Sequence, residues 1–351
     1  MLAGIGSLTL LDHEVVTEND LGSQFLVAEE HLGKNVSIIC SFQPNCQKQN
    51  VLTINQRAQA AAPQIRSMNP RVKLHVDTDD IHTKPPGFFA NFDITIATEL
   101  DFTTYTNINA ACNMANRPFY AAGLHGVYGY IFADLMSHDF VIERTKSNVP
   151  SKPQETPTRT ILNITTKKEN EKVIEMVTKR EIYSPLILAN TSPLPEEYTN
   201  RPRRRKQVTP LLSCLRALWE FQKTSGGRLP TFSRQDLENF TQSARDRHQE
   251  LKLDIETLDS SFLQSFLQNL GSELSPVAAF VGGGLAQDVI NVLSAREQPL
   301  QNLLLFDGEK SSAPIYPLHP FFPPEMNQSL SAVPPAANTI PLNETPGAGP
   351  S

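Results

Sequence analysis

The chain has 351 residues and a net charge of −6 at pH 7, which allows one large domain or two ordinary ones and argues against nucleic-acid binding by the whole chain. No stretch approaches the roughly 20 apolar residues of a membrane span, and no basic segment followed by an apolar run marks a signal peptide at the N-terminus. Four Cys residues in a chain of this length do not form a disulfide scaffold, so the composition is typical of a soluble intracellular protein.

The first part of the chain alternates predicted strands and helices. Leu8–Asp12 is a short apolar run that ends in an acid, and it predicts a buried parallel strand. Arg57–Met68 is rich in Ala and predicts a helix, although Pro63 opposes it. Further strands are predicted over Val72–Val76, Phe92–Ala97, Phe119–Ala122 and Val127–Asp134, with a helix over Phe102–Asn116. The alternation predicts an α/β domain with a parallel sheet.

The remainder of the chain divides into three predicted regions. Residues 145–206 are polar and Pro-bearing and predict a linker with an irregular segment, in which Thr166–Glu181 is a charged helix or hairpin. Residues 207–318 contain four helical patterns followed by a strand. The helices are predicted over Leu211–Lys223, Arg234–Leu251, Ser260–Leu270 and Ser275–Ala295, and the strand over Leu303–Phe306. Residues 319–351 are rich in Pro and predict a disordered tail. The α/β part of the chain is predicted over residues 1–144.

Several segments together resemble one family. LTLLDHEVVTENDLGSQFLV, RAQAAAPQIRSMNPRVKLHV, SPVAAFVGGGLAQDVINVLS and NLLLFDG are similar to segments of the ubiquitin-activating-type (ThiF/MoeB-like) adenylation domain. The resemblance implies a Rossmann-like fold. Within the family, LLDHE, GSQF, VDTDDI and GVYGYIFADL are most similar to the smaller, regulatory subunits of the enzymes that activate the modifier SUMO.

That resemblance implies a heterodimer. In such an enzyme, ATP and Mg bind at the site of the larger, thioester-forming subunit, which adenylates SUMO, forms a thioester and passes SUMO to a conjugating enzyme. For this chain we therefore expect no catalytic residue and no nucleotide bound by the chain alone, and neither a membrane nor a nucleic acid as partner. A self-sufficient adenylyltransferase, a non-catalytic binding scaffold and, more distantly, a nicotinamide dehydrogenase stay open as alternatives.

The resemblance also implies a degenerate nucleotide pocket. Asp12 matches the acid that binds ribose, Arg57 stands at the position of a phosphate-facing Lys, and Asp101 matches an acid near the metal and phosphates. Ser23 stands where active members carry an Arg, and Arg and Lys are not equivalent at a phosphate site. The residues alone are equally consistent with a structural role for Asp12, as an acid that ends a strand and faces solvent.

Two segments are candidates for the partner interface, the loop Asp12–Phe25 and the helix Pro276–Leu293. The residues singled out on them are Gln24, Phe25, Pro276, Gly282, Gly283 and Gln287. Gly282 and Gly283 lie within a helical pattern, which favours a packing role over phosphate binding.

The cysteines and one basic run complete the candidate sites. Cys112 and Cys214 fall in helical patterns that predict buried structural thiols, and Cys40 and Cys46 have no second pair, which argues against zinc. The basic run Arg203, Arg204, Arg205 and Lys206 is either a nuclear import signal or a solvated loop. A nuclear location, with the cytoplasm as a second compartment, is expected.

Two irregularities interrupt the family pattern. Residues 36–56 contain no acid and two Cys, and removing them restores GKNRAQAAAP; we interpret this insertion as a retained intron rather than an apolar β-prone loop. A Gly-rich loop and the family's central first strand should precede Leu8, so we expect two exposed strand edges and suspect a truncated gene model. A short form that folds only on a partner is the alternative.

Overall fold

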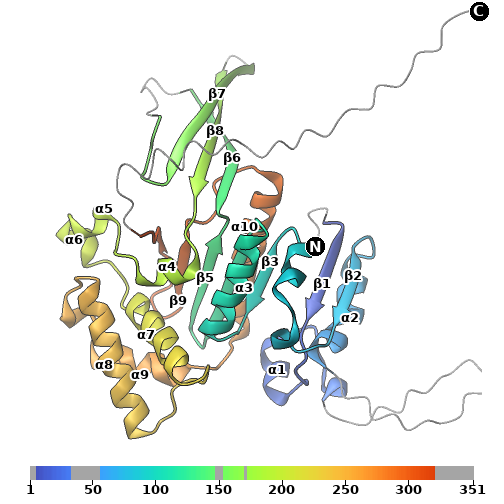
Figure 1. The fold of residues 1–351 in the computed structure, drawn as a ribbon, viewed down its shortest axis with the longest axis vertical. Coiled ribbons are helices and arrows are strands. Elements are labelled where there is room, and N and C mark those ends of the chain that lie inside the picture. Colours follow the sequence, from blue (N-terminus) through green and yellow to red (C-terminus); the bar gives the residue numbers. More distant parts are fainter. Residues whose placement is uncertain (1–4, 33–55, 147–152, 170–171, 321–351) are drawn as a thin grey trace, which may run out of the picture. The chain divides into compact units, whose positions relative to one another are not determined.

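The computed structural model describes residues 5–32, 56–146, 153–169 and 172–320, and Figure 1 labels their helices and strands. The anomalous segment 36–55, with Cys40 and Cys46, and residues 321–351 of the predicted tail lie outside the described residues. The strands are β1 Ser7–Leu11, β2 Lys73–Asp77, β3 Thr95–Thr98, β4 Phe119–His125, β5 Tyr128–Asp134, β6 Ser137–Thr145, β7 Arg159–Glu169, β8 Lys172–Ile182, β9 Leu303–Asp307 and β10 Ile315–Tyr316. The α-helices are α1 Glu18–Ser23, α2 Arg57–Met68, α3 Phe102–Met114, α4 Leu186–Thr191, α5 Glu196–Thr199, α6 Pro202–Arg205, α7 Leu211–Thr224, α8 Arg234–Glu250, α9 Ser260–Asn269 and α10 Ser275–Ser294.

The largest sheet has five strands in the order β10-β9-β5-β4-β3. β3 and β4 pair in parallel, whereas β5 pairs antiparallel with both β4 and β9. Only Gly126 and Val127 separate β4 from β5, and Gly126 has a φ of 60°; a connection this short can only return the chain antiparallel. The prediction of parallel pairing is thus confirmed for β3 with β4 and is wrong for β5.

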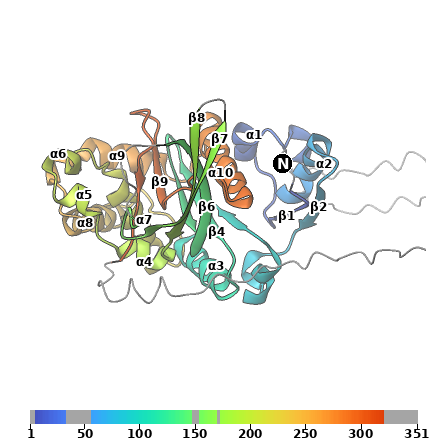
Figure 2. The same cartoon turned by 90° about the horizontal axis from the view of Figure 1, so that it is seen from above.

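Helices cover both faces of this sheet, α3 on one side and α10 on the other (Figure 2). Phe119 and Tyr130 pack on the first face, in a core that includes Tyr105 of α3 and Trp219 of α7. Alternate residues of the same strands turn to the second face, where Ile131 packs with Val281 of α10. Because successive strand residues point to opposite faces, the near-continuous apolar sequence of β4 and β5 fills both cores.

Helix α10 is apolar around most of its circumference. By length and composition alone it could cross a membrane, so the sequence-based statement that no stretch is apolar enough is wrong for Ser275–Ser294. In this structure Val277, Val281, Leu285 and Val292 form a buried stripe at helical spacing. This stripe packs on β4 and β5, and the opposite side of the helix is exposed.

The region predicted as a linker is a second sheet. Strands β6, β8 and β7 form an antiparallel sheet in that order, and the 11-residue strands β7 and β8 form a hairpin. The hairpin alternative for residues 166–181 is confirmed. Strand β6 crosses the predicted boundary at residue 144 and pairs with β8. At the other predicted boundary, the amide groups of Leu318 and Asn302 exchange hydrogen bonds, and the side chain of His319 in the predicted tail contacts Ser184 and Gln301.

Strands β1 and β2 form a separate two-stranded parallel sheet. We call residues 5–32 and 56–77, which contain β1, α1, α2 and β2, the N-terminal unit. The predicted helix Arg57–Met68 is confirmed with Pro63 inside it. A small apolar cluster of Val16, Val27 and Ala60 holds this unit together.

Candidate functional site

The candidate site forms where β1 ends and α2 begins. The backbone N–H of Arg57 donates to the carbonyl oxygen of Glu14 at 2.8 Å, so the first turn of α2 is fixed beside the segment that follows β1. Helix α1 starts in a capping box, in which the Asp20 carboxylate accepts from the backbone N–H of Thr17 at 2.7 Å and from its hydroxyl at 2.8 Å. Two helix N-termini therefore place their first-turn side chains around the carboxyl end of β1.

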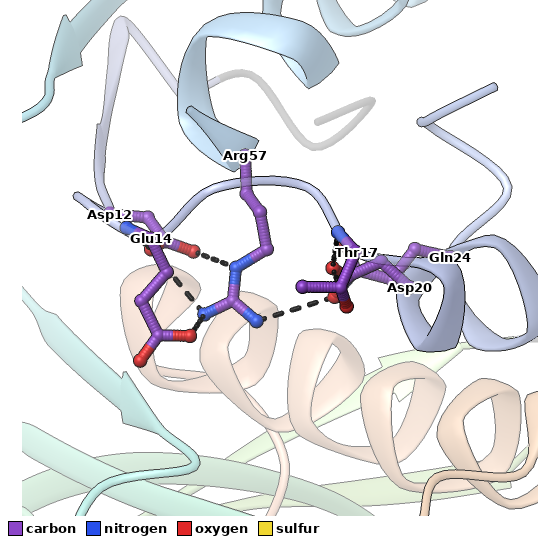
Figure 3. A network of polar contacts seen from close by, with 6 residues as sticks. All are labelled: Asp12, Glu14, Thr17, Asp20, Gln24 and Arg57. Carbon is purple, nitrogen blue, oxygen red and sulfur yellow. Dashed lines mark hydrogen bonds and ion pairs between the residues drawn. The ribbon is translucent and has the colours of Figure 1, made fainter. Parts of the chain in front are cut away.

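The guanidinium group of Arg57 forms ion pairs with three carboxylates from this segment (Figure 3). Its Nε lies 2.9 Å from Asp12 Oδ2, its Nη2 lies 2.8 Å from Glu14 Oε2, and its Nη1 lies 3.3 Å from Asp20 Oδ1. Asp20 is buried at 5% exposure, whereas Asp12 and Glu14 are partly open to solvent. Arg57 thus cross-links the loop after β1, helix α1 and helix α2.

The protonation states of this network are well defined. Burial alone would raise the pKa of Asp20, but the hydrogen bonds from Thr17 and the charge of Arg57 hold that pKa below its ordinary value. Burial alone would lower the pKa of Arg57, and the neighbouring Asp12, Glu14 and Asp20 raise it instead. With three carboxylates around one guanidinium group, the network has an excess of acidic side chains.

This arrangement conflicts with phosphate binding by Arg57. A guanidinium group has five N–H donors, and Asp12, Glu14 and Asp20 occupy all three of its nitrogens. A phosphate that reached Arg57 would lie next to three carboxylates that already contact its guanidinium group. The residues present do not fit a nucleotide triphosphate.

A cavity of about 330 Å³ adjoins the network and lies between β1 and β3. Its lining includes the apolar side chains Leu11, Phe88, Phe89, Phe92, Ile94, Ile96 and Ile108. The acidic residues of the lining are Asp12, Glu14, Asp79, Glu99 and Glu273, and its one Lys or Arg is Arg57. Such a cavity combines an apolar floor with an acidic edge, and its negative potential disfavours anions.

Glu99 is the most perturbed acid of this cavity. It follows β3 with a φ of 54°, and its Oε1 accepts from the backbone N–H of Leu124 at 2.6 Å. The side chain opens toward the cavity, but protein atoms surround its carboxyl group. This desolvation, with repulsion from Glu273, raises the pKa of Glu99 to about 8. A carboxyl group that titrates near neutral pH is typical of a functional position.

Asp101 is separated from Asp12 and Arg57. It is the N-cap of α3, where Oδ1 accepts from the backbone N–H groups of Thr103 and Thr104 and Oδ2 accepts from the Thr104 hydroxyl. Its Cβ faces Gly227, and it does not contribute to the lining of the cavity. The structure thus brings together two of the three residues assigned to a nucleotide pocket and gives the third a structural role.

The residues assigned to a partner interface lie on two neighbouring elements. Phe25 is 75% exposed, and Gln24 lines the cavity and donates weakly to Asp20. Pro276, Gly282, Gly283 and Gln287 lie on the exposed side of α10. A Cβ at Gly282 or Gly283 would meet nothing within 4 Å, so packing within the described chain does not require these glycines. The Ser275 hydroxyl donates to the Gly22 carbonyl oxygen at 2.6 Å and joins the two elements.

Cys112 and Cys214 are buried as their helical patterns predict, and the basic run forms part of helix α6 and the residue after it. Cys112 and Cys214 are fully buried, and burial raises the pKa of both thiols. Among the described residues, no group of three or more His, Cys, Asp or Glu side chains could hold a metal ion. Arg203 and Lys206 are exposed at α6, while Arg204 pairs with Glu197 and Arg205 with Asp254.

Sequence reasoning missed the acids that dominate the site. Thr17 followed by Asp20 is a capping pattern that could have located α1 and the buried carboxylate. Glu14 and Glu99 carry no comparable signal, because their roles depend on the approach of α2 and of Glu273 from distant parts of the chain.

Comparisons with known proteins give a consistent result. Residues 43–326 match the ThiF family. The DNA damage tolerance protein RHC31 of Saccharomyces cerevisiae is 32% identical over 321 residues, which cover 90% of this chain and 84% of that protein. SUMO-activating enzyme subunit 1 of Rattus norvegicus is 31% identical over 325 residues, covering 91% and 83% of the two chains. The Homo sapiens protein of the same name is 30% identical over 325 residues, covering 91% and 84%.

Proposed function

Because this chain belongs to the ThiF family, we propose that it is the regulatory, non-thioester subunit of a heterodimeric SUMO-activating enzyme. The observation that carries the proposal is the similarity along nine-tenths of the chain to proteins named SUMO-activating enzyme subunit 1. A larger subunit and SUMO follow as partners, and a SUMO-conjugating enzyme is reached through the complex. Neither a membrane nor a nucleic acid is proposed as a partner.

The geometry favours a supporting role over chemistry by this chain. Cys112 and Cys214 are fully buried with raised pKa values, and a buried neutral thiol is a poor nucleophile. Each nitrogen of the Arg57 guanidinium group already contacts a carboxylate. ATP and Mg are therefore assigned to the larger subunit, and this chain acts by packing against it through Phe25 and the exposed side of α10.

Reconstitution of SUMO thioester formation tests this function. The larger subunit, SUMO, ATP and Mg²⁺ are combined with and without the full chain, and the thioester is detected on a non-reducing gel. Thioester should form on the larger subunit only when this chain is present, and Cys214→Ala should support it as well as the unsubstituted chain. Formation of the thioester in the absence of this chain contradicts the proposal, and so does a thioester formed on this chain itself. Pairing that supports no thioester identifies a binding scaffold instead.

The alternative of a self-sufficient adenylyltransferase requires a nucleotide site in this chain. Exchange of pyrophosphate into ATP by the chain alone, with SUMO present, would revive it. The carboxylates around Arg57 and the acidic cavity predict no exchange. Arg66→Ala on the exposed side of α2 is a matched control for Arg57→Ala. Exchange that persists equally in both variants would come from a contaminating enzyme.

A nuclear location is part of the proposal, with the cytoplasm as a second compartment. The basic run Arg203, Arg204, Arg205 and Lys206 lies at the surface, and clustered basic residues are the pattern that import receptors recognise. Substitution of all four by Ala should shift a fluorescent fusion of the full chain out of the nucleus. Substitution of the exposed Arg234 and Arg245 of α8 by Ala is a control for the loss of surface charge, with half that change in charge.

A further inference from the structure

Residues 153–158 precede β7 and lie against the hairpin of β7 and β8, and we call them the arm. The backbone N–H of Ile161 in β7 donates to the carbonyl oxygen of Pro153 at 2.7 Å. The backbone N–H of Ile182 in β8 donates to the carbonyl oxygen of Thr158 at 2.9 Å. Backbone hydrogen bonds therefore fix both ends of the arm to the hairpin.

Two buried charges of the hairpin depend on the arm and on the residue after it. Lys179 is 7% exposed, and its Nζ donates to both carboxylate oxygens of Glu155 at 2.8 and 2.7 Å. Glu181 is 1% exposed and accepts from the Thr158 hydroxyl at 2.6 Å and from Nε of Arg159. Burial raises the pKa of Glu181, whereas its contacts with Thr158 and Arg159 oppose that rise. Because a buried charge that loses its partner is strongly destabilising, a new charge close to these contacts would disturb the arm.

The middle of the arm is a tight bend that is open to solvent. Thr156 and Arg159 exchange two backbone hydrogen bonds across it, of 3.4 and 3.2 Å, and residues 153–157 are all exposed. The Thr156 hydroxyl lies 3.3 Å from the Thr158 hydroxyl, which is long for a bond between two hydroxyl groups. Pro157 disfavours a helical conformation of the residue before it. The bend thus presents an accessible hydroxyl group that is only weakly engaged.

Six residues of the chain are a Ser or Thr followed directly by Pro. Five of them lie in the described part of the chain, namely Thr156, Ser184, Ser192, Thr209 and Ser275. Ser184, Ser192 and Thr209 are at most 8% exposed, so an enzyme cannot reach their hydroxyl groups in the folded chain. The structure therefore leaves two of the five accessible.

Thr156 and Ser275 differ in their surroundings. Ser275 is the first residue of α10, and its hydroxyl donates to the carbonyl oxygen of Gly22 at 2.6 Å. Thr156 lies outside any helix or strand, and of the five it is the one with a Lys or Arg three positions further on, Arg159. A Thr-Pro pair followed by a basic residue is typical of the substrates of proline-directed protein kinases, which recognise the pattern of side chains around the acceptor.

We propose that Thr156 is a phosphorylation site for a proline-directed protein kinase, and that its phosphate releases the arm from the hairpin. In the transfer, Oγ1 of Thr156 bonds to the γ-phosphorus of ATP while the bond between that phosphorus and the departing ADP oxygen breaks. The hydroxyl proton passes to the catalytic carboxylate of the kinase. The product carries about 1.5 to 2 negative charges at neutral pH. This inference does not rest on the proposed function.

The added charge acts on the contacts below the bend. The Thr156 hydroxyl contacts the Thr158 hydroxyl, which in turn donates to Glu181, so the phosphate enters close to a buried carboxylate. The phosphate and the carboxylate repel each other, and the phosphate also attracts the guanidinium group of Arg159, the ionic partner of Glu181. Both effects weaken the hold of Glu181 on Thr158. The backbone bond from Ile182 to Thr158 then opens more easily.

Phosphorylation of the full chain tests the site. The chain is incubated with ATP, Mg²⁺ and a purified cyclin-dependent kinase, and the modified residues are identified by mass spectrometry of peptides. Thr156 should be phosphorylated, whereas Ser184, Ser192 and Thr209 should not be. Thr156→Ala and Pro157→Ala should abolish this modification, and Thr156→Ser should retain it.

Amide hydrogen exchange tests the release of the arm. In the phosphorylated chain the amides of Ile161 and Ile182 should exchange about tenfold faster than in the untreated chain, through local opening, and the amides of β4 should not change. Thr156→Ala treated with the same kinase is the control, because it retains any phosphate added elsewhere, including at Thr345.

The two experiments have separate contradicting results. A kinase that leaves Thr156 unmodified, or that modifies Ser275 as readily, overturns the phosphorylation site. Unchanged exchange of Ile161 and Ile182 in the phosphorylated chain overturns the release of the arm. Slower exchange of these amides overturns it as well, because the phosphate would then order the arm through Arg159.

Discussion

The sheet core and the N-terminal unit are held together by different forces. In the core, Phe119, Tyr120 and Phe132 are at most 1% exposed and pack under helices on both faces. In the N-terminal unit, none of the residues of β1 is buried, and the apolar cluster of Val16, Val27 and Ala60 is small. Ion pairs of Arg57 supply what apolar packing does not. The comparison teaches that one chain can combine a self-sufficient core with a unit that depends on polar links.

Removal of a core side chain should have the largest effect. Phe119→Ala deletes a fully buried ring and should lower the free energy of unfolding by about 3–5 kcal/mol, measured by urea denaturation. Val16→Ala in the N-terminal unit should change global unfolding much less, because its cluster can open without the core. Equal losses for the two variants would show that the regions unfold as one.

Acid should destabilise the core through its neutral histidines. Burial between Tyr130 and Phe266 lowers the pKa of His125 to about 4, and burial does the same for His319. The unfolded chain binds more protons below its His pKa of 6.5, so stability is present above pH 6.5 and is lost as the pH falls toward 4. The shift for His125 corresponds to about 3 kcal/mol.

Thermal unfolding between pH 4.5 and 7 measures this loss. His125→Phe keeps an aromatic ring beside Phe266 and removes the titration, so its melting temperature should depend less on pH. An unchanged pH dependence in this variant would mean that His125 is not the group responsible.

Loss of Arg57 should act locally in the N-terminal unit. Arg57→Ala leaves Asp20 buried without its cation and removes the link between α1 and α2. We expect opening of β1 and α1 to become easier by about 1–2 kcal/mol, seen as faster amide exchange there and unchanged exchange in β4. Arg66→Ala, an exposed Arg of the same helix, should leave both regions as they are.

The smallest effect is expected at Glu99, because the residue is exposed and solvent screens the effect of its titration. Desolvation raises the pKa of Glu99 to about 8, so the folded chain holds a proton that the unfolded chain releases near pH 4.5. The stability linked to this proton is present below pH 4.5 and is lost as the pH rises through 8. Glu99→Gln should therefore melt at a higher temperature than the unsubstituted chain at pH 9 and at the same temperature at pH 4.5. An equal difference at both pH values would contradict the assigned titration.

The elements that the sequence predicted well are those with strong local signals. The Ala-rich pattern of Arg57–Met68 gave both ends of α2, and α7 and α10 were found from apolar residues at helical spacing. The antiparallel pairing of β5 with β4 was missed because local periodicity carries no information about pairing direction. The short connection through Gly126 and Val127 indicates that direction.

The candidate site was predictable only in part. The family resemblance singled out Asp12 and Arg57, and the structure places them in contact. The family resemblance could not show that Asp20 and Glu14 pair with the same guanidinium group, or that Asp101 serves as a helix cap. These roles depend on how helices from separate segments approach each other. The assignment of a nucleotide role to Asp12, Arg57 and Asp101 stays a prediction, and the geometry weighs against it.

Amide hydrogen exchange of the isolated full chain tests the difference between the two regions most directly. Amides of β4 and β5 should exchange only through global unfolding, whereas those of β1 and β2 should exchange orders of magnitude faster through local opening. Equally slow exchange in both regions of the isolated chain would contradict the account.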